Sequence, residues 1–179
     1  MARPHSLTLA ALLAWLLAPL TAFGQTAPPR ASAGPDAPRY LAAMESELRA
    51  LELDPLCRAE SPARARCEVR VHAPGSLEEL DLHVVYSDDT DTVYAYVPAL
   101  AQAAPDARTT PALLRRLAEL NWELLLGKLE WSATTGEVRL SMVLSTDSNF
   151  DRAAFRSMVR NLARLAGRLG AELQRLAVR

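Results

Sequence analysis

The spacing of hydrophobic residues changes several times along the chain, and each change marks a new structural element. Spacings of three and four residues predict helices from about Ala37 to Leu51, from Thr110 to about Leu125 and from Asp151 onward. Between these helices apolar and polar residues alternate, which is the pattern of half-buried strands. Strands are therefore expected at residues 67–72, 80–84, 93–97, 128–131 and 137–144, and residues 53–57 could add a further short strand.

Capping signals mark where the predicted helices begin. Asp36 is the expected N-cap of the first helix, and the Thr110 hydroxyl, followed by a proline, is the expected N-cap of the second. Asp151 is expected to cap the last helix, where Phe150 and Phe155 stand at the two positions of a hydrophobic staple. The predicted order is helix, three or four strands, helix, two strands, helix.

Polar and glycine-containing segments separate the predicted strands. Residues 73–76 and 88–91 predict the turns of an antiparallel meander, and residues 134–136 predict the turn of a later hairpin. Gly127 marks a bend into the strand that follows it, and residues 98–108 are expected to form a loop. This order of elements predicts an α+β fold.

The first two dozen residues are typical of a secretory signal. Arg3 and His5 begin a weakly basic segment, and the run from Leu7 to Leu20 is almost wholly apolar. Such a run has the length of a signal-peptide core and falls short of the ~20 residues that span a bilayer. Cleavage after Gly24 would leave Gln25 as the new N-terminus, so we expect a protein exported to the periplasm or beyond. An uncleaved N-terminal anchor is the alternative.

The chain beyond the signal divides into a tether and a domain. Residues 25–37 contain several prolines among alanine, serine and glycine and hold no large aliphatic residue, which predicts a flexible Pro/Ala-rich tether. Residues 38–179 are long enough for one domain with a hydrophobic core. We therefore expect a signal peptide at residues 1–24, a tether at residues 25–37 and a single domain at residues 38–179.

Charge is balanced overall but unevenly placed. The 20 basic and 21 acidic residues give a net charge of −1, which does not indicate a nucleic-acid partner. Seven acidic residues and no basic ones lie between Arg70 and Arg108, whereas seven arginines and two acids follow from Asp151 onward. Two solvated faces of one domain explain this asymmetry. Self-association through complementary patches, or an anionic partner for the basic end, are the alternatives.

Five arginines recur at every fourth residue of the last predicted helix. Each is rotated by about 40° from the one before, so together they spread across the face opposite the apolar stripe. A soluble amphipathic helix accounts for this pattern, and a docking face for a partner or for anionic lipid is the alternative. The five are Arg152, Arg156, Arg160, Arg164 and Arg168.

The two cysteines, Cys57 and Cys67, suggest a disulfide, because an even pair in an exported protein is usually bonded. Two free thiols are the alternative. Nine residues separate the two cysteines, which is not the C-x-x-C spacing of a redox pair. A zinc site is not indicated either, because zinc needs four ligands and only His72 lies near the two cysteines.

The usual signatures of catalysis and metal binding are missing from the sequence. His72 and His83 lie in predicted strands, without the G-x-S-x-G elbow of a hydrolase triad. The acidic run at residues 88–91 lacks the glycine and the distal glutamate of an EF-hand loop, and no glycine-rich phosphate loop is present. We therefore expect no catalytic residue, no cofactor and no bound metal.

Four aromatic residues, at strand or helix-end positions, could line a ligand groove. Residues at such positions more often belong to the core or to a sheet face, which is the alternative. The four are Tyr94, Tyr96, Trp122 and Trp131.

The order of the predicted elements, together with the sequence of the second half, resembles the YbjN-like family of bacterial proteins, which share the fold of type III secretion chaperones. The resemblance covers residues 38–173. The resemblance lies in residues 117–129, where a helix ends in Asn121 and a short apolar loop leads to Gly127 at the start of a strand, and in residues 150–155. It implies a mostly antiparallel sheet with helices packed on one face, a homodimer, and no catalytic residues. The signal peptide and the cysteine pair depart from the usual pattern of that family.

These features predict an exported, non-enzymatic protein-binding domain of the bacterial cell envelope, with a chaperone-like or regulatory role. The expected interaction surface comprises Tyr94, Tyr96 and the five arginines of the last helix, for a protein partner that the sequence does not identify. The alternatives are a small-ligand or hydrolytic domain with an unrecognised site, and an envelope protein that docks to anionic lipid through the arginines, although membrane contact is not expected.

Overall fold

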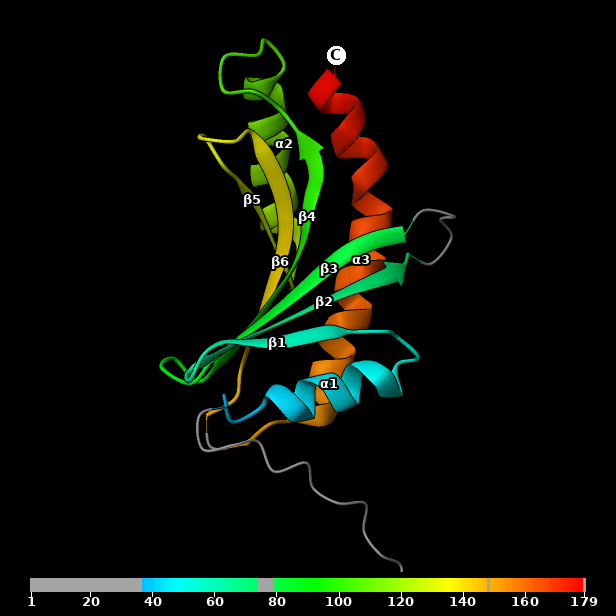
Figure 1. The fold of residues 1–179 in the computed structure, drawn as a ribbon. Helices are drawn as coiled ribbons and strands as arrows, with labels where there is room; N and C mark the ends of the chain where they lie inside the picture. The colour runs from blue at the N-terminus through cyan, green and yellow to red at the C-terminus, as the bar shows by residue number, and fades with distance from the viewer. Residues whose placement is uncertain (1–36, 74–78, 148, 179) are drawn as a thin grey trace, which may run out of the picture. The chain divides into compact units, whose positions relative to one another are not determined.

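The computed structural model describes residues 37–73, 79–147 and 149–178, which form three helices and one sheet (Figure 1). The predicted signal peptide and nearly all of the predicted tether lie outside the described residues. In chain order the elements are α1 (Leu41–Ala50), β1 (Leu56–Ser61), β2 (Arg64–His72), β3 (Glu79–Ser87), β4 (Thr92–Gln102), α2 (Thr110–Glu123), β5 (Lys128–Trp131), β6 (Glu137–Ser145) and α3 (Arg152–Val178).

The six strands form one antiparallel sheet in the order β1-β2-β3-β4-β6-β5. The first four strands form the predicted meander, and the later hairpin inserts β6 beside β4, so that β1 and β5 are the two edge strands. The α+β class and the antiparallel pairing are confirmed. The further short strand that the sequence suggested before the meander is also present, but it occupies residues 56–61 rather than 53–57.

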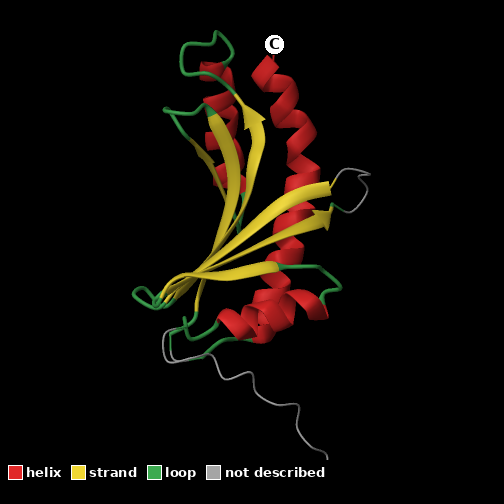
Figure 2. Ribbon diagram, viewed as in Figure 1, coloured by secondary structure: helices red, strands yellow, loops and turns green. Residues whose placement is uncertain are grey.

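The helices cover one face of the sheet (Figure 2). Along β4, Val93, Ala95 and Val97 are buried toward the helices, while Tyr94 and Tyr96 between them are half-buried. The predicted apolar stripe of α3 is confirmed, and it packs chiefly on β4 and β6. Its buried members are Phe155, Met158, Val159, Leu162, Leu165, Ala166, Leu169 and Leu173.

The N-terminal end of α3 has the predicted cap and staple. The Asp151 Oδ1 atom accepts a hydrogen bond of 2.9 Å from the Ala154 backbone N–H. The Phe150 and Phe155 rings lie 5.1 Å apart between centroids.

Within the described ranges, neither α3 nor the two shorter helices are apolar enough over the necessary length to cross a bilayer.

Helix α1 begins at Leu41, later than predicted. Residue Tyr40 occupies the N-cap position without a side-chain cap, and Asp36 lies outside the described residues. The delay arises because Arg39 binds the β3–β4 turn. Its backbone N–H donates to Asp88 Oδ2 at 3.1 Å, and its guanidinium forms an ion pair with Asp91 at 3.2 Å. These contacts hold residues 37–39 outside the helix.

The prediction that Thr110 is the N-cap of α2 is wrong. Thr110 is the first helical residue, and Thr109 occupies the N-cap position without a side-chain cap. Both hydroxyls are engaged elsewhere. Thr110 Oγ1 donates to the Ala104 carbonyl at 2.5 Å, and Thr109 Oγ1 donates to the Ala177 carbonyl at 3.0 Å. The threonines therefore bind the helix start to the preceding loop and to the end of α3.

Strand β4 continues to Gln102, so the predicted loop at residues 98–108 is wrong in its first part. Pro98 suggested a strand end, because proline cannot donate to a ladder. Here the pairing of β4 with β3 already stops at Tyr96, and the pairing with β6 slips between Val97 and Ala101. This irregularity is a bulge, which accommodates the proline without the loss of a ladder hydrogen bond.

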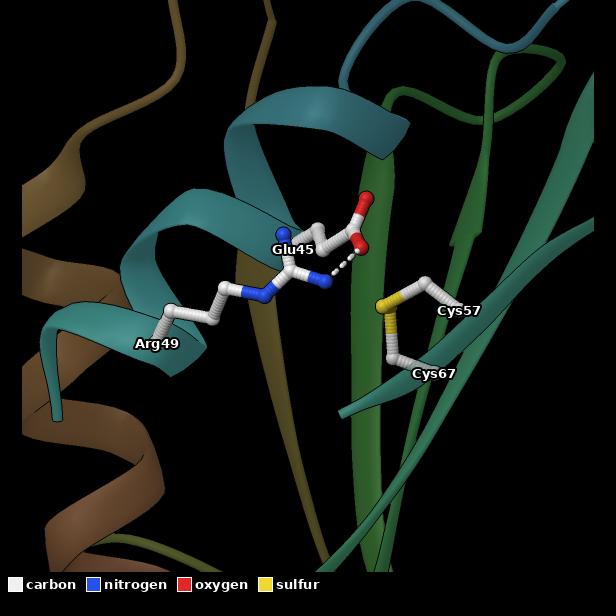
Figure 3. Close-up of a disulfide and its surroundings, with 4 residues drawn as sticks. All are labelled: Glu45, Arg49, Cys57 and Cys67. Atoms are coloured by element: carbon white, nitrogen blue, oxygen red, sulfur yellow. Dashed lines mark ion pairs between the residues drawn. A yellow bond between two sulfur atoms is a disulfide. The ribbon is translucent and has the colours of Figure 1, made fainter. Parts of the chain in front are cut away.

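The predicted disulfide joins Cys57 of β1 to Cys67 of β2, directly opposite each other with their Cα atoms 4.0 Å apart (Figure 3). Cys67 is fully buried, and α1, with Glu45 and Arg49, lies beside the bond. The bond therefore fixes an edge strand to the sheet at the place where α1 packs.

Replacing both cysteines with alanine is expected to lower the free energy of unfolding by about 2–3 kcal/mol, because the bond restricts the unfolded chain over a short loop. Urea denaturation would measure this difference. Reduction of the unaltered protein should produce a similar loss and leave the double variant unchanged. A variant as stable as the unaltered protein would contradict a stabilising role for the bond.

Candidate functional site

The predicted arginine face of α3 divides into two groups. Arg152 and Arg156 both form ion pairs with Glu47 of α1, whose side chain is buried, and the Arg152 contact measures 2.5 Å. Burial alone would raise the pKa of Glu47, but the hydrogen bonds from the two arginines outweigh it and hold the pKa below its ordinary value. These two arginines therefore join α3 to α1.

The second group, Arg160, Arg164 and Arg168, is exposed. Arg164 donates to the Asn161 Oδ1 atom at 2.7 Å, and none of the three forms an ion pair within the described part of the chain. Fewer cations are thus available to an anionic partner than the sequence suggested.

Tyr94 and Tyr96 lie on the sheet face opposite the helices, within an aromatic and cationic stack. Their ring centroids are 5.3 Å apart, and the Arg139 guanidinium lies over both rings at 5.6 and 5.3 Å. The His83 ring stacks on Tyr96 at 5.0 Å. Cation–π and aromatic contacts of this kind fix the orientation of side chains that would otherwise be mobile on an open face.

Hydrogen bonds complete this network. The Tyr94 hydroxyl donates to Glu130 at 2.6 Å, and Glu130 also accepts from Arg139 and Lys128. Burial alone would raise the pKa of Glu130, but these three donors bring it to about 2. Burial and the bond to Glu130 raise the pKa of Tyr94 to about 12. The Tyr96 hydroxyl accepts from Arg66 at 3.0 Å. The charges of this face are therefore largely paired with one another.

A third surface, which the sequence reasoning missed, projects where α2 ends. Trp122, Leu125 and Leu126 have exposed fractions of 92%, 99% and 62%, and we call them the α2–β5 corner. The sequence pattern predicts only a groove, core or sheet-face position for Trp122 and Trp131. Trp122 instead projects into solvent, whereas Trp131 is half-buried and donates to the Ala103 carbonyl. The available signal was an apolar run continuing past the end of the helical periodicity, at residues 124–126.

Asn121 and Gly127 fix the conformation of the corner. The Asn121 side chain accepts from the Leu129 N–H at 2.8 Å and donates to the Leu129 carbonyl at 3.0 Å. It thus binds the outer backbone edge of β5. Gly127 turns the chain with φ 89°, a left-handed conformation that favours glycine, and a Cβ there would lie 3.3 Å from the Met142 side chain. The apolar side chains of the corner are therefore presented by a constrained backbone.

Two hollows lie at the end of the sheet where β2 finishes. One, of about 500 Å³, is bounded by the end of α1, β2 and α3. The other, of about 640 Å³, lies against β1, β2 and β3, and the two share Glu52, Leu53 and His72. His72 lies 3.5 Å from Glu79 in an exposed contact. Among the residues that the structure describes, no group of three or more histidine, cysteine, aspartate or glutamate side chains is placed to hold a metal ion.

The chain was compared with protein-family models, with curated proteins and with solved structures. Residues 46–175 match the YbjN family model, which is described as "Putative bacterial sensory transduction regulator". No curated protein matches the chain. A solved structure titled "Crystal Structure of the ExsC-ExsE Complex" is similar, with a TM-score of 0.43 and 14% identity, over 60% of this chain and 76% of that chain.

The Glu47 contacts give a stability prediction. Replacing Glu47 with glutamine should lower the free energy of unfolding by about 1–3 kcal/mol at pH 7, because two arginines lose a buried charged acceptor. Since the folded-state pKa is lowered, this contribution is present above about pH 4.3 and is lost as the pH falls through the folded-state pKa. Chemical denaturation as a function of pH would measure both effects.

The matched control is Glu45→Gln. Glu45 lies on the same helix and pairs with the exposed Arg49 at 2.7 Å, so its loss should cost less than about 0.5 kcal/mol. Equal losses in the two variants would show that Glu47 has no special role in joining α1 to α3.

Proposed function

The chain belongs to the YbjN family, and we propose that it is an exported, non-enzymatic protein-binding domain with a chaperone-like or regulatory role in the bacterial cell envelope. The observation that carries this proposal is the α2–β5 corner, a set of large apolar side chains exposed on a constrained backbone. The family description, which refers to a regulator, is consistent with action through another protein.

The chemistry of the corner favours a protein partner. Tryptophan is enriched among the residues that dominate binding energy at protein interfaces, and adjacent leucines supply apolar area around it. Glu123, on the last turn of α2, places negative charge beside the apolar side chains, whereas Glu119 one turn earlier is paired with Arg116 at 3.2 Å. Negative charge opposes contact with anionic lipid and is readily tolerated at the rim of a protein interface.

The protein partner that we assign to the corner is a second copy of this chain, so that the corner forms a homodimer. A two-fold interface brings the same patch of both copies together, so an apolar patch is complementary to itself, whereas a charged patch is not. The edge strand β5 is already bound by Asn121, so the contact would be made by side chains rather than by continuation of the sheet. The open face with Tyr94 and Tyr96 would then remain accessible to a different protein.

Replacing Trp122 and Leu125 together with serine should convert the dimer to a monomer and weaken self-association at least about 100-fold, which corresponds to ~2.7 kcal/mol. Light scattering and sedimentation of the chain from Gln25 onward would measure this. Val143→Ser is the matched control, because Val143 is 65% exposed on a different face. A reductant should leave the dimer intact, since the disulfide is within one chain. A monomeric unaltered protein would overturn the dimer.

Export is tested separately. Expression of the full chain in a bacterial host should place the protein in the periplasmic fraction or the medium, with a mass that begins at Gln25. Replacing Leu12 and Leu13 with arginine should abolish export, because it interrupts the apolar run that the secretion machinery recognises. A full-length product that remains in the cytosol would contradict this part of the proposal.

A further inference from the structure

Strand β5 is one of the two edges of the sheet, and its outward backbone groups belong to Leu129 and Trp131. In an antiparallel strand, residues that bond the neighbouring strand alternate with residues whose N–H and C=O groups face away from it. Both backbone groups of Leu129 bond the side chain of Asn121 rather than β6, so Leu129 faces outward and Trp131, two residues on, does too. An unpaired edge is a template for pairing with another chain.

Asn121 binds Leu129 as a neighbouring strand would. Its Oδ1 atom accepts from the Leu129 N–H at 2.8 Å, and its Nδ2 atom donates to the Leu129 carbonyl at 3.0 Å. Two residues of a hydrogen-bonded antiparallel pair exchange the same two bonds. A side-chain amide has the donor and the acceptor of a peptide group. Asn121 therefore takes the place of one residue of a further strand.

The sequence of β5 is complementary to itself when two copies run antiparallel. In a two-fold arrangement centred on Leu129, each Leu129 would exchange both backbone bonds with Leu129 of the other copy. Lys128 would then lie directly opposite Glu130 of the second copy. The two side chains share one sheet face, since they bond each other at 2.9 Å within the chain. Opposite charges placed directly across a strand pair stabilise it. A second copy of this chain therefore fits an open β5 edge.

The position of this edge makes its closure important for assembly. Trp122 and Leu125, which are exposed, follow Asn121 closely in the chain. If the β5 edge were open, each copy would have two separate surfaces for a second copy, the edge and the α2–β5 corner. Two different two-fold contacts on one molecule can link copies into open-ended chains, whereas one such contact stops at a dimer.

From these observations we infer that Asn121 closes the β5 edge against antiparallel pairing with a second copy of this chain. Self-association is thereby confined to the side chains of the α2–β5 corner, and the inference rests on the proposed function in this respect alone. Helix propensity does not explain an asparagine in the last turn of α2, because asparagine is a poorer helix former than alanine.

The test uses the chain from Gln25 onward with Trp122 and Leu125 both replaced by serine, which removes the corner contact. Sedimentation should find this parent variant monomeric from ~10 µM to ~1 mM. Adding Asn121→Ala should make self-association at least about tenfold tighter than in the parent variant, because the Leu129 groups become free to pair. Asn121→Ser should act in the same way, since one hydroxyl on a shorter side chain cannot make both bonds.

Hydrogen exchange identifies the edge that pairs. At ~10 µM, the Leu129 amide of the Asn121→Ala variant should exchange at least about tenfold faster than in the parent variant, as measured by mass spectrometry of peptides from β5. Exchange should slow again at concentrations where the variant associates. A purely structural role for Asn121 would not give this recovery of protection.

Two matched controls separate an open edge from a loosened fold. Asn161→Ala removes an asparagine of α3 that bonds only side chains, those of Ser157 and Arg164, and should leave the parent variant monomeric. Asn121→Asp keeps the acceptor for the Leu129 N–H but loses the donor and adds a charge at the edge. It should also remain monomeric, because a charged side chain at an edge opposes strand pairing.

Several outcomes would overturn the inference. They are an Asn121→Ala variant that stays monomeric at ~1 mM, unchanged exchange in β5, and association of the Asn161→Ala or Asn121→Asp variant as strong as that of Asn121→Ala. Loss of the folded state in both the alanine and the serine variants would also overturn it, because Asn121 would then be required for the fold itself. A monomeric unaltered protein would overturn only the corner dimer, since the parent variant lacks that contact.

Discussion

The burial of the apolar stripe of α3 against the inner face of the sheet is the constraint on which the other features depend. Phe155, Leu162 and Leu173 are fully buried along a helix of 27 residues, and the strands opposite present Val93, Ala95 and their neighbours to it. Because that face is covered, the sheet can present a polar and aromatic network on its other face. The same packing places the cationic side of α3 at the surface.

The arginines near the start of α3 and those further along it have different surroundings. Near its start, Arg152 and Arg156 are bound to Glu47, so α1 is held at a fixed position over the disulfide. Further along, Arg160 lines the hollow at the end of α1 and has no ion-pair partner among the described residues. Arginine on the same helix face thus joins two helices at positions 152 and 156 and remains exposed at position 160. The difference arises because Glu47 of α1 lies opposite the first two arginines.

Most of the fold follows from the sequence because its signals are local. The alternating strands, the Asp151 cap and the stripe of α3 all arise from neighbours in the chain. The exceptions depend on distant contacts. Arg39 delays α1 through a turn about 50 residues away, and Pro98 remains in β4 because β3 has already ended its pairing. The arginine surface was over-counted for the same reason, since Glu47 lies 105 residues from Arg152.

The sheet order also has a consequence for how the chain assembles. Strands β1 to β4 pair with their sequence neighbours, which makes their contacts local and quick to form. Strand β4 acquires its second neighbour only when β6 arrives, with α2 and β5 lying between them in sequence. Until then the backbone N–H and C=O groups on that edge of β4 are unpaired. The interval between the synthesis of β4 and the pairing of β6 is therefore when a nascent or refolding chain is most exposed to intermolecular strand pairing.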